Sequence, residues 1–247
     1  MTRLLKFLLG LTACLWLMPA WAGLDGEQLY RDNCMVCHGV DGQGGVGVPL
    51  SLPSFLNNVD DRFLFNTIRH GRPGRVMPTF SALSDAQINA LVAYIRTWSD
   101  KPAPVFDAKP VKGNAANGKK LFAKHCAACH GADGEGGEGT GVTFSRPRDL
   151  PIIAPALNNK GFLAAASDEM IRHTLRVGRE GTPMVSFLEA GLSEEQISDL
   201  VAFVRSYEQA EDPKPVLETD SATLMVESPY SLEETIGNIE DVLAGMN

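Results

Sequence analysis

The chain has 247 residues, of which 44% are hydrophobic and 21% are charged. This composition is that of an ordinary globular protein with enough length for two small domains, and it excludes a fibrous or disordered chain. The formal net charge is -8 and no block of Lys and Arg residues could follow a phosphate backbone, so nucleic acid is not expected as a partner.

The N-terminus has the pattern of a secretory signal peptide. Two basic residues, Arg3 and Lys6, precede an apolar run at residues 7–18, and an Ala-x-Ala sequence ends at Ala22. The run is shorter than the ~20 residues of a membrane span. We therefore expect cleavage after Ala22 and export to the bacterial periplasm, with an uncleaved anchor as the alternative. Cys14 lies within the segment that is removed.

The remaining four cysteines all belong to one short motif that occurs twice. Cys-x-x-Cys-His is formed by Cys34, Cys37 and His38, and again 92 residues later (126 minus 34) by Cys126, Cys129 and His130. Two thiols at this spacing can add to the two vinyl groups of a haem while the adjacent imidazole binds its iron. The alternatives are a zinc knuckle and a thioredoxin-like dithiol, but the sequence shows neither the other zinc ligands at finger-like spacings nor a βαβ context. Each copy therefore predicts one covalently bound haem c, two in all.

The chain around the motifs reads as two copies of one helical unit, with a short tail. The predicted boundaries are 1–22 for the signal peptide, 23–100 for the first domain, 101–113 for a Pro-rich linker, 114–208 for the second domain, 209–220 for another linker and 221–247 for the tail. A strand at 222–227 and a helix at 231–243 are expected in the tail. Because one strand and one helix cannot bury a core, the tail either packs on the rest or begins an incomplete domain.

Three helices are predicted in each copy. A short opening helix leads into the motif, a second helix is expected at 60–69 and at 167–176, and a closing helix follows a capping box at Ser84 and at Ser193. The closing helices carry matching apolar stripes, which we expect to pack across the opening helix of the same copy. These stripes are Ile88, Leu91, Val92, Ile95 and Trp98 in the first copy and Ile197, Leu200, Val201, Val204 and Tyr207 in the second.

A methionine occupies an equivalent place in each copy. Met77 and Met184 each follow a Gly-Arg pair, lie in a stretch rich in Gly and Pro, and precede a phenylalanine by three residues. A methionine is usually core filler, but this repeated placement predicts that each is the second axial ligand of its haem, because Met opposite His is a common pair in electron-transfer haems. The offset is 107 at the methionines (184 minus 77) against 92 at the motifs, so the second copy has a 15-residue insertion around 139–155. This insertion is a partner-docking loop, a cover over the haem edge or a tolerated surface loop.

The two copies resemble class I cytochromes c, and their tandem order is similar to bacterial dihaem cytochromes of the cytochrome c4 type. The resemblance covers about residues 23–208, and residues 226–235 weakly resemble the start of a small α+β domain. It implies a mostly α fold of two tandem cytochrome c domains, each folded around a covalent haem, with the β-α tail added. It also implies His38 and Met77 as iron ligands in the first domain, His130 and Met184 in the second, and a proline carbonyl behind each histidine. Pro49 or Pro53, and Pro151 or Pro155, are the candidates for those carbonyls.

A six-coordinate haem has no vacant position for a substrate, so the expected function is electron transfer in a respiratory chain and not catalysis. The expected partners are a donor dehydrogenase or quinol-oxidising complex and an acceptor oxidase or reductase, with the membrane reached only through partner complexes. The alternative is a catalytic dihaem oxidoreductase of the thiosulfate dehydrogenase or peroxidase type, or the cytochrome subunit of a dehydrogenase complex. His70 and His173 are expected to be surface or packing residues, and His125 an exposed neighbour of the motif.

Overall fold

The computed structural model describes residues 24–45, 47–136 and 154–209, together with positions 231, 232, 234 and 236. These residues form helices and irregular segments without strands, so the prediction of a mostly α protein is confirmed for the part of the chain that is described. The predicted signal peptide, the strand at 222–227 and nearly all of the insertion lie outside the described residues. No helix among the described residues has the length and apolar character needed to cross a membrane.

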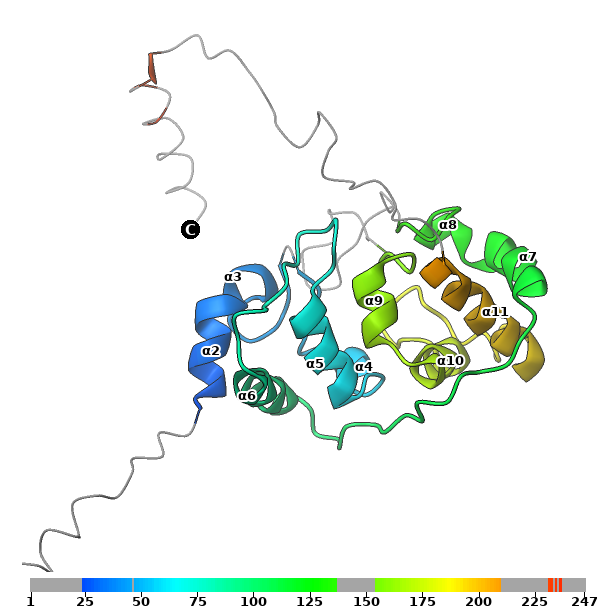
Figure 1. Ribbon diagram of the computed structural model, residues 1–247, viewed down its shortest axis with the longest axis horizontal. Coiled ribbons are helices and arrows are strands. Elements are labelled where there is room, and N and C mark those ends of the chain that lie inside the picture. The colour runs from blue at the N-terminus through cyan, green and yellow to red at the C-terminus, as the bar shows by residue number, and fades with distance from the viewer. Residues whose placement is uncertain are drawn as a thin grey trace, which may run out of the picture. The chain divides into compact units, whose positions relative to one another are not determined.

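The two copies repeat one order of helices (Figure 1). The first copy contains α2 (Gly26–Asn33), α3 (Met35–His38), α4 (Pro53–Leu56), α5 (Asp61–His70) and α6 (Asp85–Arg96). The second copy contains α7 (Ala115–His125), α8 (Ala127–His130), α9 (Lys160–Ala165), α10 (Asp168–Val177) and α11 (Glu194–Ser206), followed by the 3₁₀ turn η2 (Tyr207–Gln209). The chain falls into two units, Met1–Pro213 and Lys214–Asn247, and both copies lie in the first.

Local capping determines where most of these helices begin. The side chains of Asp60 and Ser167 accept hydrogen bonds from the third backbone N–H of α5 and α10, so both helices start one residue later than predicted. The predicted capping boxes at Ser84 and Ser193 are both present. In the second unit, Ser231 and Glu234 make the same kind of reciprocal cap at the start of the helical residues Leu232, Glu234 and Ile236.

The closing helix of each copy packs across the opening helix, as the apolar stripes predict. A glycine at the crossing lets the two helices approach closely. A Cβ atom on Gly26 would collide with the carbonyl oxygen of Ala90, and a Cβ atom on Gly118 would collide with that of Asp199. The aliphatic members of the stripes are buried, while Trp98 and Tyr207 are partly buried against the core. In the second copy Asp199 also accepts hydrogen bonds from the backbone of Asn114 at 2.6 Å and the side chain of Asn117 at 2.7 Å, which fixes α7 against α11.

An aromatic side chain of the opening helix fills the space beneath this crossing. Tyr30 is fully buried, its hydroxyl donates to the carbonyl of Gly39 at 2.7 Å, and its ring lies 5.1 Å from that of Trp98. Phe122 takes the equivalent place in the second copy, 5.2 Å from Phe203. These contacts connect the helix crossing to the turn that follows the haem motif.

The end of each closing helix is held by an arginine that makes the same contacts in both copies. Arg96 forms an ion pair with Asp61 at 2.6 Å and donates to the carbonyls of Leu56 and Val59. Arg205 pairs in the same way with Asp168 and donates to Leu163 and Ala166. The carbonyls lie just before α5 and α10, so each arginine joins three segments of its copy.

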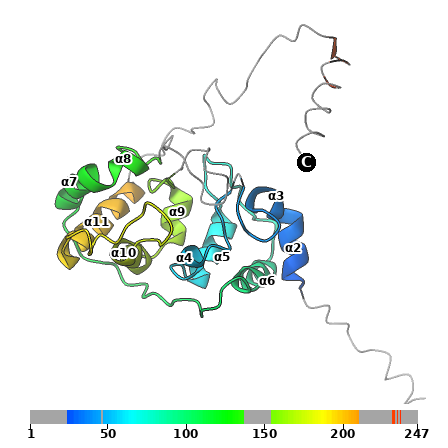
Figure 2. The same cartoon turned by 180° about the vertical axis from the view of Figure 1, so that it is seen from behind.

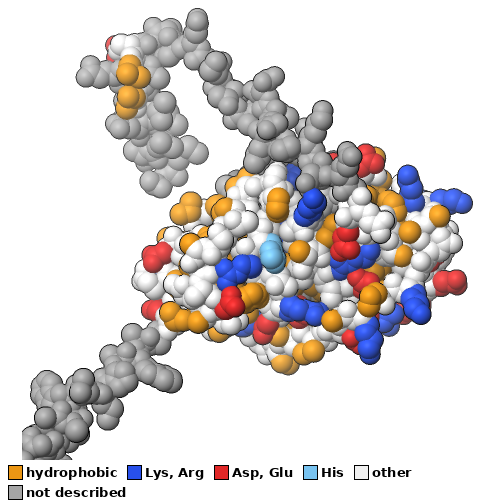
Figure 3. Space-filling model, viewed as in Figure 1, with side chains coloured by type: hydrophobic (Ala, Val, Ile, Leu, Met, Phe, Trp, Pro, Cys, Tyr) orange, Lys and Arg blue, Asp and Glu red, His pale blue; other side chains and the backbone are white. Residues whose placement is uncertain are grey.

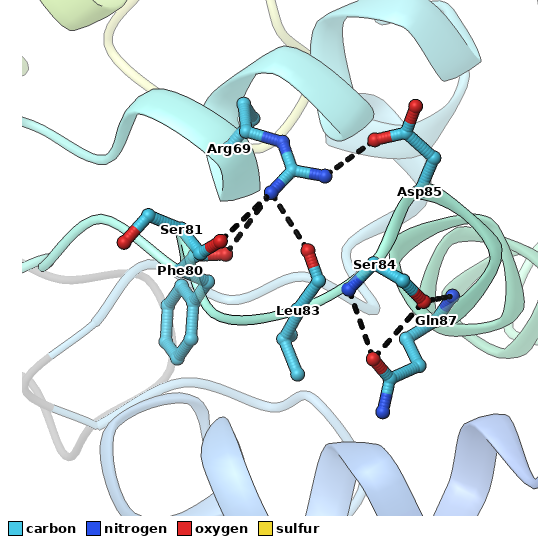
Figure 4. A network of polar contacts seen from close by, with 7 residues as sticks. All are labelled: Arg69, Phe80, Ser81, Leu83, Ser84, Asp85 and Gln87. Carbon is cyan, nitrogen blue, oxygen red and sulfur yellow. Dashed lines mark hydrogen bonds and ion pairs between the residues drawn. The ribbon is translucent and has the colours of Figure 1, made fainter.

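A second arginine network joins α5 to the segment that contains Met77 (Figure 4). Arg69 donates to the carbonyl of Leu83 at 2.7 Å and pairs with Asp85 at the start of α6, beside the Ser84 capping box. In the second copy Arg176 pairs with Glu194 at 2.9 Å. The segment from α5 to α6 is therefore closed at both ends by polar contacts.

The two copies contact each other through α5 and α9, which lie side by side in Figures 1 and 2. The rings of Phe63 and Phe162 meet edge to face at 6.4 Å, and Asn159 donates to the carbonyl of Pro73 at 2.8 Å. His173 hydrogen-bonds through Nε2 to the side-chain oxygen of Asn58 at 2.9 Å. His173 is thus a packing residue of the contact between the copies, in agreement with one of its two expected roles.

The segment between the copies, predicted as a semi-rigid spacer, is attached to the second copy. The backbone N–H of Val111 donates to Asp168 at 2.7 Å, and the ring of Phe106 lies 5.2 Å from that of His173. Its irregular conformation agrees with the prolines of the sequence. Because of these contacts with α10, the segment is packed against the second copy and is not a free tether.

Replacing Gly118 by Ala tests the close crossing of α7 and α11. Alanine normally favours a helix by about 1 kcal/mol over glycine, but here its Cβ would meet the backbone of Asp199 and force the helices apart. We expect the free energy of unfolding to fall by about 1–3 kcal/mol, the usual cost of overpacking. Urea unfolding of the purified holoprotein, followed by far-ultraviolet circular dichroism, measures this change.

The control is Lys120→Ala on the exposed face of the same helix, which should change the free energy of unfolding by no more than about 0.5 kcal/mol. A Gly118→Ala protein as stable as the starting protein, or more stable, would show that the crossing tolerates a larger separation.

Candidate functional site

The three motif residues of each copy come from one short turn. Backbone N–H groups of Cys37 and His38 donate to the carbonyl of Cys34 at 3.2 and 2.9 Å, and the helix α3 ends at Gly39 with φ 80°. The second copy repeats this geometry with Cys126 as the acceptor and α8 as the helix. The structure therefore brings both thiols and the imidazole of each motif together on a single helical turn.

The histidine of each motif is held by a backbone carbonyl. His38 Nδ1 lies 2.8 Å from the oxygen of Val48, and His130 Nδ1 lies 2.9 Å from that of Pro155. Because a carbonyl only accepts, Nδ1 must carry the proton, and the lone pair of Nε2 is left for a metal. Nε2 of either histidine has no hydrogen-bond partner among the described residues.

These contacts correct one expectation and agree with another. Neither Pro49 nor Pro53 provides the first carbonyl; Val48 does, one residue before Pro49. Pro155 provides the second, and Pro151 lies outside the described residues. The hydrogen bond needs only a carbonyl oxygen in the right place, so the residue type at that position is not determined by the bond itself.

The equivalence of Val48 and Pro155 also places the insertion. Gly44 and Gly136 donate to the carbonyls of His38 and His130, with an offset of 92 (136 minus 44). The next equivalent pair, Val48 and Pro155, already has an offset of 107 (155 minus 48). The additional residues therefore lie between Gly136 and Pro155, and those at 137–153, including Arg146 and Arg148, are outside the described residues.

Burial changes the protonation of the motif side chains. It lowers the pKa of His38 and of His130, even though the carbonyl hydrogen bond acts in the opposite direction. Both imidazoles are therefore neutral near pH 7, the form that binds a metal. Burial likewise raises the pKa of Cys34 and of Cys126 to about 11, so that these groups are thiols rather than thiolates.

The chemistry of this donor set fits a haem. The four cysteines of the motifs are free thiols rather than disulfides. Gly47 lies against the His38 ring, where an added Cβ would come within 2.6 Å of Cε1, so the loop closes on one edge of the imidazole. No group of three or more His, Cys, Asp or Glu side chains in the described residues could enclose a metal ion. A haem would bring its own four nitrogen ligands and need only axial ligands from the chain.

The two methionines lie on loops that are closed by the same backbone hydrogen bond. Arg72 N–H donates to the carbonyl of Met77 at 2.9 Å, and Arg179 N–H donates to that of Met184 at 2.7 Å. Both methionine side chains are half-buried. In each copy the histidine comes from the motif helix and the methionine from the loop after the second helix, so the two expected ligands belong to different segments. Gly71, at φ 60°, passes so close to the backbone of this loop that a Cβ would collide with the carbonyl of Pro78.

The arginine of each Gly-Arg pair is half-buried, and the sequence shows the pair as a repeat without indicating its role. Arg72 donates to Thr67 at 3.0 Å and lies over the ring of Phe162 in the other copy, 5.9 Å from its centroid. Arg179 donates to the carbonyl of Ser54 in the other copy at 3.2 Å and lies 5.6 Å from the centroid of Phe55. Burial lowers the pKa of both guanidinium groups to about 10. Neither group is paired with a carboxylate among the described residues.

Two further histidines, His70 and His125, are not part of the motifs. His70 is exposed at the end of α5. His125 was expected to be exposed, but it is half-buried and its ring contacts that of Phe187 at 6.2 Å. Phe187 is the phenylalanine that follows Met184, so this contact joins the end of α7 to the second methionine loop.

Two family models match the chain, one in each copy. The model described as cytochrome c matches residues 115–208, and the model described as cytochrome c oxidase, cbb3-type, subunit III matches residues 18–95. The match at residues 18–95 includes the first motif and Met77, and the match at residues 115–208 includes the second motif and Met184.

Curated relatives are similar over both copies. The cbb3-type cytochrome c oxidase subunit CcoP of Azospirillum sp. is 29% identical over 63% of this chain and 53% of its own length. The same subunit of Rhodobacter capsulatus is 29% identical over 73% of this chain and 61% of its own. The cytochrome bc1 complex cytochrome c subunit of Mycobacterium tuberculosis is 27% identical over 76% of this chain and 64% of its own. The chain thus spans between half and two thirds of the length of these relatives.

A solved structure shares the fold. A chain of the Kuenenia stuttgartiensis reducing HAO-like protein complex superposes with a TM-score of 0.52 and 23% identity, covering 74% of this chain and 95% of that chain. The two motifs, the two family models and this shared fold agree with one another. The chain is therefore a dihaem cytochrome c of class I, with one cytochrome c domain and one haem c in each of its two copies.

Proposed function

We propose that the protein carries single electrons in the bacterial periplasm, between a respiratory or dehydrogenase donor and a terminal acceptor such as an oxidase. The observation that carries this proposal is the repeated pair of sites, in each of which a histidine with a free Nε2 and a methionine on a fixed loop come from separate segments. The names of the relatives, an oxidase subunit and a bc1 complex subunit, support the same role.

The residues that would hold each haem follow from this geometry. Cys34 and Cys37 would form the thioether bonds of the first haem, with His38 and Met77 as the axial ligands. In the second domain the same roles fall to Cys126 and Cys129, with His130 and Met184 as the axial ligands. When bound, a haem supplies one-electron exchange between ferrous and ferric iron.

The chain's own contribution is to orient these ligands. The carbonyls of Val48 and Pro155 keep the proton on Nδ1 and so direct Nε2 away from the backbone. The hydrogen bonds of Arg72 and Arg179 N–H close the methionine loops. Two strong axial ligands leave no position for a substrate, which favours electron transfer over catalysis.

Arg72 and Arg179 fit the anionic part of the cofactor. Desolvation of a guanidinium without a negative partner is costly, and the propionate carboxylates are the negative groups that a haem brings. Each arginine also contacts the other domain, at Phe162 and at Ser54. We therefore propose that both arginines would act as countercharges for the haem propionates.

The proposed partners are redox complexes. The donor would be a dehydrogenase or a quinol-oxidising complex, and the acceptor an oxidase or reductase, with the membrane reached only through them. Encounters of electron carriers with such partners are typically small and transient. The alternative, a catalytic dihaem oxidoreductase, requires one haem with an open distal position.

The optical spectrum of the purified protein, oxidised and reduced, with and without carbon monoxide, tests the proposal. We expect both haems to be low-spin, to show the near-infrared sulfur-to-iron charge-transfer band when oxidised, and to leave carbon monoxide unbound, because His and Met occupy both axial positions. Rapid binding of carbon monoxide by one haem would overturn the electron-carrier proposal in favour of the catalytic alternative.

Met77→Leu and Met184→Leu test the axial assignments one at a time. Leucine keeps the volume but removes the sulfur, so each variant should lose the charge-transfer band of one haem, bind carbon monoxide at that haem and show a lower reduction potential. Met170→Leu, at a buried methionine in α10, is the matched control and should keep both bands. A variant whose spectra match those of the control would show that its methionine is not a ligand.

Arg72→Gln and Arg179→Gln test the propionate assignment. Loss of a positive charge close to a haem destabilises the electron-rich ferrous state, so each variant should lower the reduction potential of one haem by tens of millivolts. A shift of ~59 mV changes the one-electron equilibrium constant tenfold. Spectroelectrochemical titration measures both potentials. Arg62→Gln, at an exposed arginine of α5, is the control and should leave them unchanged. Potentials equal to those of Arg62→Gln would contradict the assignment.

A further inference from the structure

The opening helices of the two domains carry opposite charges at equivalent positions. With the offset of 92, Glu27 of α2 corresponds to Lys119 of α7 and Asp32 corresponds to Lys124. Lys120 corresponds to the neutral Gln28. The two helices have the same place in their domains, since both lead into a haem motif and both are crossed by the closing helix. The shared fold therefore does not require either charge.

The lysines of α7 are free to meet a partner. Lys119, Lys120 and Lys124 are all exposed, and none of them forms an ion pair within the part of the chain that the structure describes. On α2, by contrast, Glu27 is paired with Arg31 at 2.6 Å. Figure 3 shows blue Lys and Arg side chains gathered over the end of the cytochrome unit where Figure 1 places α7. We call the exposed surface of these three lysines the α7 lysine face.

Helix stability accounts for only part of this charge. Lys124 lies in the last turn of α7, where a cation interacts favourably with the helix dipole. Lys119 and Lys120 lie in the middle of the helix, where the dipole effect has faded. No acidic residue within α7 could form a stabilising pair with them, because the helix has none. The three unpaired cations of this helix repel one another, although the chain as a whole has a net charge of -8. No ion pair among the described residues offsets this repulsion.

The α7 lysine face also adjoins the second haem site. α7 ends at His125, and Cys126 and the motif helix α8 follow without a break. Lys124 is two residues before Cys126, and the ring of His125 at the end of α7 contacts that of Phe187, which follows Met184. An anionic protein attracted to the lysines would therefore arrive beside the second haem and not the first.

We infer that the α7 lysine face is the docking surface for a redox protein with an acidic face, which exchanges electrons with the second haem. The inference rests on the proposed electron-transfer function. The equivalent positions of α2 have Glu27, paired with Arg31, and Asp32, so α2 lacks the unpaired cations that would attract the same partner. Steering by such a face acts mainly on the association rate and weakens as salt shortens the Debye length.

A matched pair of charge reversals tests this docking surface. Lys119→Glu/Lys124→Glu changes the α7 lysine face by four charges at exposed helix positions, where Glu is as good a helix former as Lys. Lys101→Glu/Lys109→Glu makes the same charge change in the linker, also at exposed positions. The probe is mitochondrial cytochrome c in two forms, unmodified and therefore basic, or succinylated so that its lysine amines become carboxylates. Stopped-flow mixing of the reduced probe with the oxidised protein measures the second-order rate constant of electron transfer.

With the succinylated probe we expect the α7 reversal to lower the rate constant on the order of tenfold at low ionic strength, with the difference fading near 1 M salt. The linker reversal should have a much smaller effect, and the unmodified probe should not lose rate with the α7 variant. Equal losses for the two variants would show a general charge effect and overturn the docking surface. Unchanged rates for the α7 variant would also overturn it. If neither form of the probe exchanges electrons with the starting protein, the electron-transfer function itself fails, a result distinct from both.

Discussion

The close crossing of the opening and closing helices is the constraint on which each domain depends. A glycine on the opening helix lets the two backbones approach at Gly26 and at Gly118. The closing helix can then bury its apolar stripe, and its aromatic end closes over Tyr30 or Phe122. Tyr30 in turn holds the carbonyl of Gly39, the residue that ends the motif helix. In the first domain the packing of these helices thus also fixes the turn that presents both thiols and the imidazole.

The second level of organisation is a set of arginines that repeat from one domain to the other. Arg96 and Arg205 hold the carbonyls just before the second helix. Arg69 holds the carbonyl of Leu83, and Arg176 pairs with Glu194 at the start of the closing helix. An arginine suits these places because its planar group can donate to several carbonyls and still pair with a carboxylate. The ion pairs of Arg69 and Arg176 join the second helix to the start of the closing helix, on either side of the methionine loop.

Much of the fold could be predicted from the sequence because the signals are local. The capping boxes at Ser84 and Ser193 are short-range hydrogen bonds, and the apolar stripes follow directly from the helical period, so these elements were expected and are present. The helix starts at Asp61 and Asp168 differ from prediction by one residue, because the preceding residue acts as a cap. The motif and the repeated methionines also identify the candidate sites without a structure.

What the sequence did not predict depends on contacts between distant segments. The carbonyl behind His38 belongs to Val48 because the loop geometry, and not the residue type, selects it. The roles of Arg72 and Arg179 arise only when the two domains meet, since each contacts an aromatic ring of the other. The linker could be recognised from its prolines, but its attachment to Asp168 could not.

The two methionine loops differ in how they use the contact between the domains. Position 75 of the first methionine loop corresponds to position 182 of the second (182 minus 75 is 107). Arg75 reaches out to the carbonyl of Glu135 in the other domain, and Pro73 beside it accepts from Asn159. Thr182 instead turns back and accepts from the N–H of Met184. Both methionine loops contact the neighbouring domain, the second through Arg179. At positions 75 and 182, however, the first loop binds the other domain, whereas the second closes on itself. A change at the contact between the domains would therefore disturb more contacts of the first methionine loop than of the second.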